Sequence, residues 1–198
     1  HFTIHSFPTR RSSDLVTVLV GETGSGKTTQ LPLILKAKGL AGNGVLGVTE
    51  PRRMAATETA KFAADQINEP LGRGVGYKVR FDNKVSDKTQ ICFMTDGTLL
   101  EEMKYDPELS RYSTIMLDEA HERSVNIDLL LGLLKDLLDR RPDLRLVVSS
   151  ATIDPAMFAD YFGGAPIIDV DGRTYPVDVQ WDKDYYSRQE QAEAVVDK

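Results

Sequence analysis

The alternation of short apolar runs with amphipathic stretches is the feature that most restricts the fold of this chain. The apolar runs with the length and composition of strands are VTVLV, GVLGVT, TQICFMT, STIMLDE, LRLVVSSA and APIIDV. Helix-like segments separate most of them, at residues 28–38, 54–67, 98–104, 125–138 and 155–162. Strands that are apolar along most of their length are typical of a parallel sheet covered on both faces. The pattern predicts an α/β fold, with a mostly parallel sheet and helices on both faces.

Composition narrows the class of protein further. No apolar run approaches the roughly 20 residues of a membrane span, so we expect no membrane partner. The single cysteine, Cys92, excludes an internal disulfide and a multi-cysteine zinc site, and its strand-like surroundings predict a buried thiol. The net charge of −6 mildly disfavours a nucleic acid held mainly by charge. A nucleic-acid partner would have to be held by backbone N–H groups, hydroxyls and single arginines.

A glycine-rich loop follows the first apolar run. GETGSGKTT fits the pattern G-x-x-x-x-G-K-[ST], in which backbone N–H groups and the start of a helix surround phosphate oxygens. In this pattern the lysine reaches the β- and γ-phosphates, and the hydroxyl of the next residue binds Mg²⁺. The alternative is a glycine-rich turn that binds nothing. We expect the nucleotide to be bound by Gly21, Glu22, Thr23, Gly24, Ser25, Gly26, Lys27, Thr28 and Thr29.

An acidic pair follows the run STIML. P-loop enzymes need a second carboxylate at a neighbouring strand end to hold Mg²⁺, and Asp118 supplies one. Glu119, the next residue, is placed to contact the metal or to orient and deprotonate the attacking water. The alternative is a solvated helix start rich in acidic residues. His121 by itself is more typical of a structural hydrogen-bonding residue than of a catalyst.

Polar residues also follow other strands. Ser150 and Thr152, after LRLVV, can sense a γ-phosphate, although taken alone they are better explained by an ordinary strand-to-turn transition. Arg52 and Arg53, after GVLGV, can clamp a phosphate backbone or can be surface arginines that bind nothing.

Two further stretches have more than one interpretation. Thr95 and Thr98, in TDGTLLEE, flank a glycine at a predicted helix start, where helix capping is the simplest role. GYKVRFDNKVSDKTQICF, residues 76–93, predicts two short extended segments joined by a polar turn, an excursion from the α/β order.

Taken together, these residues resemble the DEAH-box helicases of superfamily 2, in particular the bacterial-type RNA helicases. The likeness covers about residues 16–180, in the family's order. Motifs I, Ia, Ib, II and III are matched by GETGSGKTTQLP, TEPRRMAAT, TDGTLL, DEAHERS and SAT, and GYKVRFD resembles the family's hook-shaped turn. The resemblance extends through RPDLRLVVSSATIDPAMFADYF and GRTYPVDV.

The resemblance implies a RecA-like P-loop NTPase domain in the cytoplasm that uses Mg²⁺ and ATP, or another nucleoside triphosphate. Nucleotide binding and hydrolysis would fall to Lys27, Thr28, Asp118 and Glu119. Coupling of hydrolysis to movement on single-stranded RNA would fall to His121, Ser150 and Thr152. Contacts with the RNA backbone would fall to Arg52 or Arg53, Arg80 and Thr98.

The chain also departs from the family pattern. Many relatives carry a base-stacking arginine in the helix after motif Ia, where this chain has Phe62, which would either stack on a base or belong to the core. Glu50 stands where glutamine is common. No Q-R-x-G-R-x-G-R stretch follows, so we expect the second RecA-like domain and its arginine fingers to lie outside this sequence. Residues 181–198 would then begin the linker toward that domain.

The first residues raise a separate question. HFTIHSFPTRRSSDL can be interpreted as an RNA-binding arm, a targeting peptide or a non-native extension. SFPTRRSSDL resembles the codon-by-codon translation of a common sequencing adapter, and the family resemblance begins at Val16. We therefore expect residues 1–15 to be non-native and disordered.

The predicted function is that of the first motor lobe of an RNA helicase, moving 3′ to 5′ when joined to its second lobe. The competing hypotheses are a stand-alone nucleotide-binding regulatory module and a motor that acts on DNA.

Overall fold

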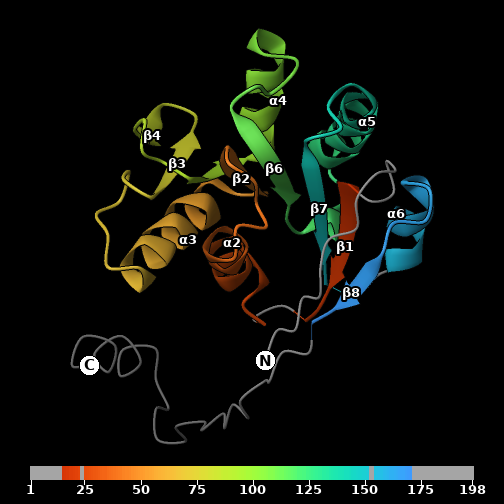
Figure 1. The fold of residues 1–198 in the computed structure, drawn as a ribbon, viewed down its shortest axis with the longest axis horizontal. Coiled ribbons are helices and arrows are strands. Elements are labelled where there is room, and N and C mark those ends of the chain that lie inside the picture. The colour runs from red at the N-terminus through yellow and green to blue at the C-terminus, as the bar shows by residue number, and fades with distance from the viewer. Residues whose placement is uncertain (1–14, 23–24, 152–153, 171–198) are drawn as a thin grey trace, which may run out of the picture.

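One mixed sheet organises the protein in this computed structural model, which describes residues 15–22, 25–151 and 154–170 (Figure 1). Its strand order is β4-β3-β5-β2-β6-β7-β1-β8. Every neighbouring pair is parallel except β3 and β4. The strands are β1 (Val16–Val20), β2 (Val45–Glu50), β3 (Val75–Val79), β4 (Asp82–Lys84), β5 (Ile91–Thr95), β6 (Tyr112–Leu117), β7 (Arg145–Ser150) and β8 (Ile167–Asp169). This confirms the predicted α/β fold and its mostly parallel sheet.

Helices cover both faces of the sheet, as expected for strands that are apolar along most of their length. On one face lie α2 (Lys27–Ala37) and α3 (Arg53–Gln66), and on the other lie α4 (Asp96–Tyr105), α5 (Val125–Arg140) and α6 (Pro155–Tyr161) (Figure 1). A short 3₁₀ turn, η1 (Ala120–Glu122), follows β6. Successive strand residues point to opposite faces, so the sheet has an apolar core on each side.

The α3 helix shows how the sequence sets the distance between a helix and the sheet. Its buried residues are all alanines, Ala56, Ala60, Ala63 and Ala64. Their small side chains let the helix backbone approach the strands closely, and they leave the larger side chains of α3 on its outer side.

The stretch predicted as an excursion belongs to the same sheet. The β3 and β4 strands form an antiparallel hairpin at the sheet edge, and β3 also pairs in parallel with β5. The turn between them places Phe81 in the left-handed region, at φ 68°. A Cβ atom on Gly76 would lie 2.1 Å from the carbonyl oxygen of Lys84, so only glycine fits where the hairpin closes.

Parallel strands place the segments that follow them at one edge of the sheet. The segments after β1, β2, β5, β6 and β7 carry the glycine-rich loop, the arginine pair, the threonine pair, the acidic pair and the small hydroxyl residues. The predicted site residues that the structure describes therefore lie at this carboxyl edge, whereas Arg80 reaches it from the β3–β4 hairpin.

Candidate active site

The glycine-rich loop between β1 and α2 surrounds the ammonium group of Lys27. This lysine is only 4% exposed, and its Nζ donates hydrogen bonds to the carbonyl oxygens of Gly21 (2.5 Å) and Glu22 (2.8 Å). Gly26 has φ 82°, a left-handed conformation that glycine adopts without strain, just before the helix begins. Thr23 and Gly24 lie outside the described residues.

The first glycine of this loop is fixed by two other segments. The N–H of Gly21 donates to the carbonyl of Ser150 at 3.2 Å, which joins the loop to the end of β7. A Cβ atom on Gly21 would lie 2.8 Å from the carbonyl oxygen of Val170, whose own N–H donates to Val20 at 2.7 Å. Glycine is therefore required where the chain that follows β8 passes the loop.

The loop and the acidic pair meet directly. The hydroxyl of Thr28 donates a hydrogen bond to Oδ2 of Asp118, although the two residues follow different strands. Asp118 is 1% exposed, and its other oxygen, Oδ1, has no hydrogen-bond partner among the described residues. A hydroxyl and a carboxylate are oxygen ligands of the kind that Mg²⁺ prefers. The residues present therefore fit that ion.

No cluster of three His, Cys, Asp or Glu side chains that could hold a metal occurs among the described residues. A Mg²⁺ site of the P-loop kind does not require such a cluster, because one or two protein ligands act together with phosphate oxygens and water.

Glu119 follows Asp118 in a left-handed conformation, with φ 50°, which is uncommon outside glycine and asparagine. Burial, and then the negative charge of Asp118, raise the pKa of Glu119 above its ordinary value. A carboxylate with a raised pKa accepts a proton more readily than an exposed one.

His121 joins this carboxylate to the end of β7. Its Nε2 lies 3.1 Å from Oε2 of Glu119, and its Nδ1 accepts a hydrogen bond from the N–H of Ala151 at 3.1 Å. Because Nδ1 is the acceptor, the ring donates from Nε2. Ser150 is buried, and its hydroxyl has no partner among the described residues, whereas Thr152 lies outside them.

Two further buried carboxyl groups lie behind the acidic pair. Glu50, at the end of β2, is 5% exposed, and Thr59 donates to its Oε1 at 3.3 Å. Burial, and then the charge of Asp118, raise the pKa of Glu50 to about 8. Burial also raises the pKa of Asp96 to about 6. Glu50 is therefore largely protonated at neutral pH and matches the neutral glutamine that is common at this place in the family.

Phe62 does not belong to the core, which was one of its two interpretations. The buried face of α3 is formed by alanines, and Phe62 lies off this face and is 47% exposed. It lines a cavity of about 310 Å³ together with Glu119 and residues 26–29 of the phosphate-binding loop. The aromatic ring is therefore next to the proposed nucleotide site.

A larger groove of about 790 Å³ lies between the β3–β4 hairpin and the start of α4. Three of the residues assigned to RNA contact line it, namely Arg53, Arg80 and Thr98, whereas Arg52 is not among its lining residues. Sequence reasoning missed Lys78 and Asn126, which also line the groove. Lys78 lies in the GYKVRFD stretch, two residues before Arg80, so the sequence could have pointed to it, whereas Asn126 belongs to none of the quoted motifs and only the fold identifies it.

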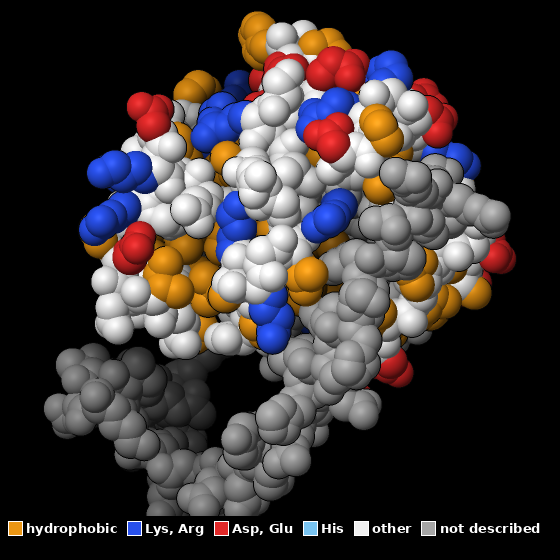
Figure 2. Space-filling view, viewed as in Figure 1, with side chains coloured by type: hydrophobic (Ala, Val, Ile, Leu, Met, Phe, Trp, Pro, Cys, Tyr) orange, Lys and Arg blue, Asp and Glu red, His pale blue; other side chains and the backbone are white. Residues whose placement is uncertain are grey.

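Charge in this groove is balanced. Its basic and acidic lining residues are Arg53, Lys78, Arg80, Asp82, Asp96 and Glu101. Figure 2 likewise shows Lys and Arg side chains interspersed with Asp and Glu on the face viewed there. Phe81 is 89% exposed, with the guanidinium of Arg80 4.8 Å from its ring centre. An exposed aromatic ring and single arginines suit contacts with individual nucleotides better than binding by bulk charge.

Thr95 caps α4, which confirms helix capping, the simplest role predicted for this stretch. Its hydroxyl oxygen accepts a hydrogen bond from the N–H of Thr98 at 3.3 Å, and the two hydroxyls lie 2.8 Å apart. Capping and a role in the groove are compatible, because both threonines also line it.

Comparison with known proteins agrees with this geometry. The sequence model of the DEAD/DEAH box helicase family matches residues 5–159. The chain belongs to the DEAD/DEAH box helicase family. Its sheet and helices are those of the RecA-like α/β fold of that domain.

Curated relatives are close in sequence but much longer. The chain is 54% identical over 166 residues to the ATP-dependent RNA helicase HrpA of Escherichia coli, and 53% identical over 171 residues to the HrpA homolog of Haemophilus influenzae. These matches cover 84% and 86% of this chain but 13% of each relative. The HrpA of Borreliella burgdorferi is 49% identical, over 83% of this chain and 20% of that protein.

Two compositional expectations can be compared with the structure. Among the described residues, no helix of this DEAD/DEAH box protein is both long and apolar enough to cross a membrane. Cys92 is a buried free thiol, as predicted, and burial raises its pKa to about 12.

Proposed function

We propose that this chain is the first motor lobe of a cytoplasmic, ATP-dependent RNA helicase. It binds Mg-NTP and single-stranded RNA, and it couples hydrolysis to 3′-to-5′ translocation when joined to a second RecA-like lobe. The observation that carries this proposal is the hydrogen bond from Thr28 to Asp118, which joins the phosphate-binding loop to the acidic pair. The names of the relatives, which are ATP-dependent RNA helicases, support RNA as the partner.

In this proposal the loop between β1 and α2 holds the nucleotide phosphates. Its backbone N–H groups and the N-terminus of α2 face the phosphate oxygens, and Lys27 neutralises the β- and γ-phosphates. Thr28 and Asp118, whose Oδ1 has no hydrogen-bond partner among the described residues, would be protein ligands of Mg²⁺, and Glu119 would be a third ligand or act through the attacking water. When bound, this ion neutralises negative charge that develops on the phosphates. Phe62 offers an aromatic surface for the base.

Glu119 orients the attacking water and accepts its proton. The raised pKa of its carboxyl group suits this role, because general bases work best when their pKa approaches the ambient pH. Through its two ring nitrogens, His121 connects Glu119 to the backbone at Ala151. A change at the γ-phosphate therefore has a hydrogen-bonded route to the segment that contains Ser150 and Thr152.

The groove between the β3–β4 hairpin and α4 takes the RNA backbone. Arg53 and Arg80 supply charge, Thr98 supplies a hydroxyl, and the exposed ring of Phe81 supplies a stacking surface. The balanced charge of the lining predicts modest affinity in this lobe alone.

Nucleotide chemistry is tested with the chain itself. The 198 residues are expected to bind Mg-ADP weakly and to hydrolyse ATP very slowly, because an arginine finger from a second lobe contributes about 10³–10⁵ in rate. Robust RNA-stimulated turnover by this chain would overturn the assignment as a single lobe. Absence of any Mg²⁺-dependent nucleotide binding would overturn the assignment of the loop.

The RNA groove is tested with a matched pair of arginines. Arg53→Ala is expected to weaken single-stranded RNA binding several-fold, whereas Arg52→Ala, in the neighbouring residue outside the groove lining, is expected to have a much smaller effect. Equal effects of both variants would argue against the groove. Stimulation of the full-length ATPase by single-stranded DNA, but not by RNA, would replace RNA with DNA as the track.

A further inference from the structure

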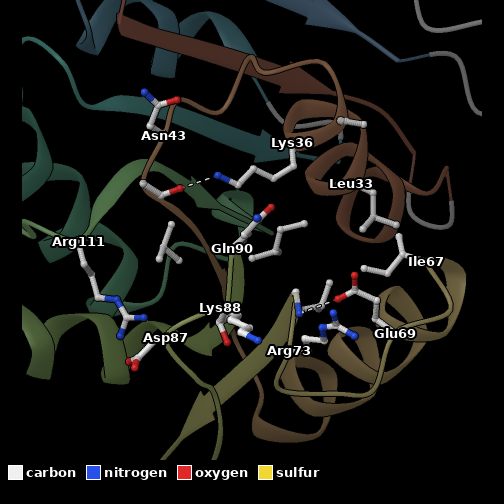
Figure 3. Close-up of a pocket in the computed structure, with 17 residues that line it drawn as sticks. Leu33, Lys36, Asn43, Ile67, Glu69, Arg73, Asp87, Lys88, Gln90 and Arg111 are labelled. Carbon is white, nitrogen blue, oxygen red and sulfur yellow. Dashed lines mark hydrogen bonds between the residues drawn. The ribbon is translucent and has the colours of Figure 1, made fainter.

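A third cavity, separate from the two described above, lies at the opposite edge of the sheet, where β2, β3 and β5 begin. It encloses about 700 Å³ and is lined by the end of α2 and by loops that precede β2, β3, β5 and β6 (Figure 3). We call it the amino-edge groove. None of its lining residues lines the proposed RNA groove or the cavity at the phosphate-binding loop. A ligand in it would leave both of those sites free.

The amino-edge groove is positively charged, unlike the chain as a whole. The chain carries a formal charge of −6, whereas four basic and two acidic side chains in the groove lining give +2. Those side chains are Lys36, Arg73, Lys88, Arg111, Glu69 and Asp87. They come from four separate segments of the chain, and only the fold brings these segments together (Figure 3).

Two of these charges hold the rim of the groove in place. The ammonium of Lys36 donates to the carbonyl oxygens of Gly42 (3.3 Å) and Gly44 (2.6 Å). The carboxylate of Glu69 accepts a hydrogen bond from the N–H of Gly74 at 3.0 Å. Both side chains are thus committed to backbone groups of the loops before β2 and β3, and they preform the cavity.

The other basic groups are available to a ligand. Arg73, Lys88 and Arg111 are exposed, and within the described residues their side-chain nitrogens make no ion pair or hydrogen bond. Arg111 only lies near the ring of Tyr112, with 5.8 Å between the guanidinium carbon and the ring centre. These three cations lie on three different loops around the groove. One ligand that carries several anionic groups could therefore pair with more than one of them.

The remaining lining distinguishes between kinds of anionic ligand. Leu33 and Ile67 contribute apolar surface, and Ile67 is 39% exposed. Asp87, also without a partner among the described residues, places a carboxylate between the cations. A phosphate chain could not use the apolar surface, and it has no cation to place opposite this carboxylate. A peptide can offer acidic, basic and apolar side chains in one segment.

We propose that the amino-edge groove docks an acidic peptide segment of a separate protein. Its carboxylates pair with Arg73, Lys88 and Arg111, and an apolar side chain packs on Leu33 and Ile67. A separate protein fits better than a later part of the same chain. The described chain leaves the sheet at Val170, after the carboxyl end of β8, which lies at the other end of the strand order.

The proposal is tested by fluorescence anisotropy with a labelled, glutamate-rich peptide of about ten residues that contains one leucine, long enough to span about 33 Å when extended. We expect the chain to bind it with an affinity that falls as salt rises. Each of Arg73→Glu, Lys88→Glu and Arg111→Glu should weaken binding about five-fold, since an exposed pair contributes up to about 1 kcal/mol. Lys38→Glu, an exposed lysine next to the groove but outside its lining, is the matched control.

Several outcomes would overturn the proposal. One is binding that none of the three reversals weakens while the variants keep the parent's circular dichroism spectrum. Another is equal binding of the peptide with glutamine in place of glutamate. Displacement of the peptide by single-stranded RNA in Arg53→Ala, whose own RNA groove is weakened, would assign the groove to nucleic acid. Binding by this chain but not by the full-length helicase would show that a part of the same protein covers the groove.

Discussion

Replacement of Glu50 by glutamine should stabilise the folded chain, and the gain should depend on pH. Glu50 is 5% exposed, and its pKa of about 8 is far above the ordinary value of 4.5 for an exposed glutamate. The folded chain therefore holds this proton more tightly than the unfolded chain does. Glutamine has nearly the same shape, carries no charge and keeps an oxygen that can accept the hydrogen bond from Thr59.

The sign and size of the effect follow from proton linkage. Below about pH 4.5 both states are protonated, so Glu50 costs no stability. As pH rises, the unfolded state ionises first, and stability falls until the folded state also ionises near pH 8. With about 1.4 kcal/mol for each pH unit between the two pKa values, the full cost above pH 8 is at most about 5 kcal/mol. Glu50→Gln removes it.

Urea unfolding followed by circular dichroism, in buffers without Mg²⁺, measures this difference. We expect the gain in unfolding free energy to be larger at about pH 8.5 than at about pH 5, by about 3 to 4 kcal/mol. Glu58→Gln, at an exposed position on α3, is the matched control and should show no such trend. A gain that is the same at both pH values, or a loss at both, would refute the idea that Glu50 is buried in its protonated form.

Three further predictions concern the site and the fold. Glu119→Gln in the full-length enzyme should keep nucleotide binding and lower turnover by about 10²–10⁴-fold, as measured by phosphate release, and surviving turnover would remove Glu119 as the general base. Phe62→Ala should weaken binding of fluorescent ADP by about 1 kcal/mol, with Met54→Ala on the same helix as a neutral control; an unchanged affinity would show that the ring does not contact the base. Gly76→Ala should destabilise the chain by about 1–3 kcal/mol in urea unfolding, because its Cβ would meet the Lys84 carbonyl, whereas wild-type stability would mean that the hairpin can open without cost.

Local patterns predicted much of the fold. The helix expected at residues 54–67 is α3 (Arg53–Gln66), and the run VTVLV is β1 (Val16–Val20), because periodicity and turn residues act over short distances. The contact of Thr28 with Asp118 also agrees with sequence reasoning, since parallel strands bring their carboxyl ends to one edge. The sequence therefore predicts which motifs lie at the same edge of the sheet, although it does not predict the order of the strands.

Other features depend on tertiary packing and left no local signal. Arg52 and Arg53 are equivalent in the sequence, and only the direction of the first turn of α3 places Arg53 in the groove lining. Phe62 is apolar and aromatic, as many core residues are. The alanines of α3 form the buried face of the helix, however, and Phe62 lies off that face. The amino-edge groove is formed by loops that are far apart in the chain, so no single stretch of sequence predicts it.

The close approach of Gly21 to Val170 has a mechanical consequence. The backbone of Val170 donates to Val20 and its carbonyl oxygen lies against Gly21, so the outgoing chain rests on the first residue of the phosphate-binding loop. A force applied to anything attached beyond Val170 would act directly on that loop, because Val170 is in contact with its first residue. By the same contact, any movement of the loop would shift the backbone at Val170. Gly21 is thus the point at which the chain that leaves the sheet contacts the phosphate-binding loop.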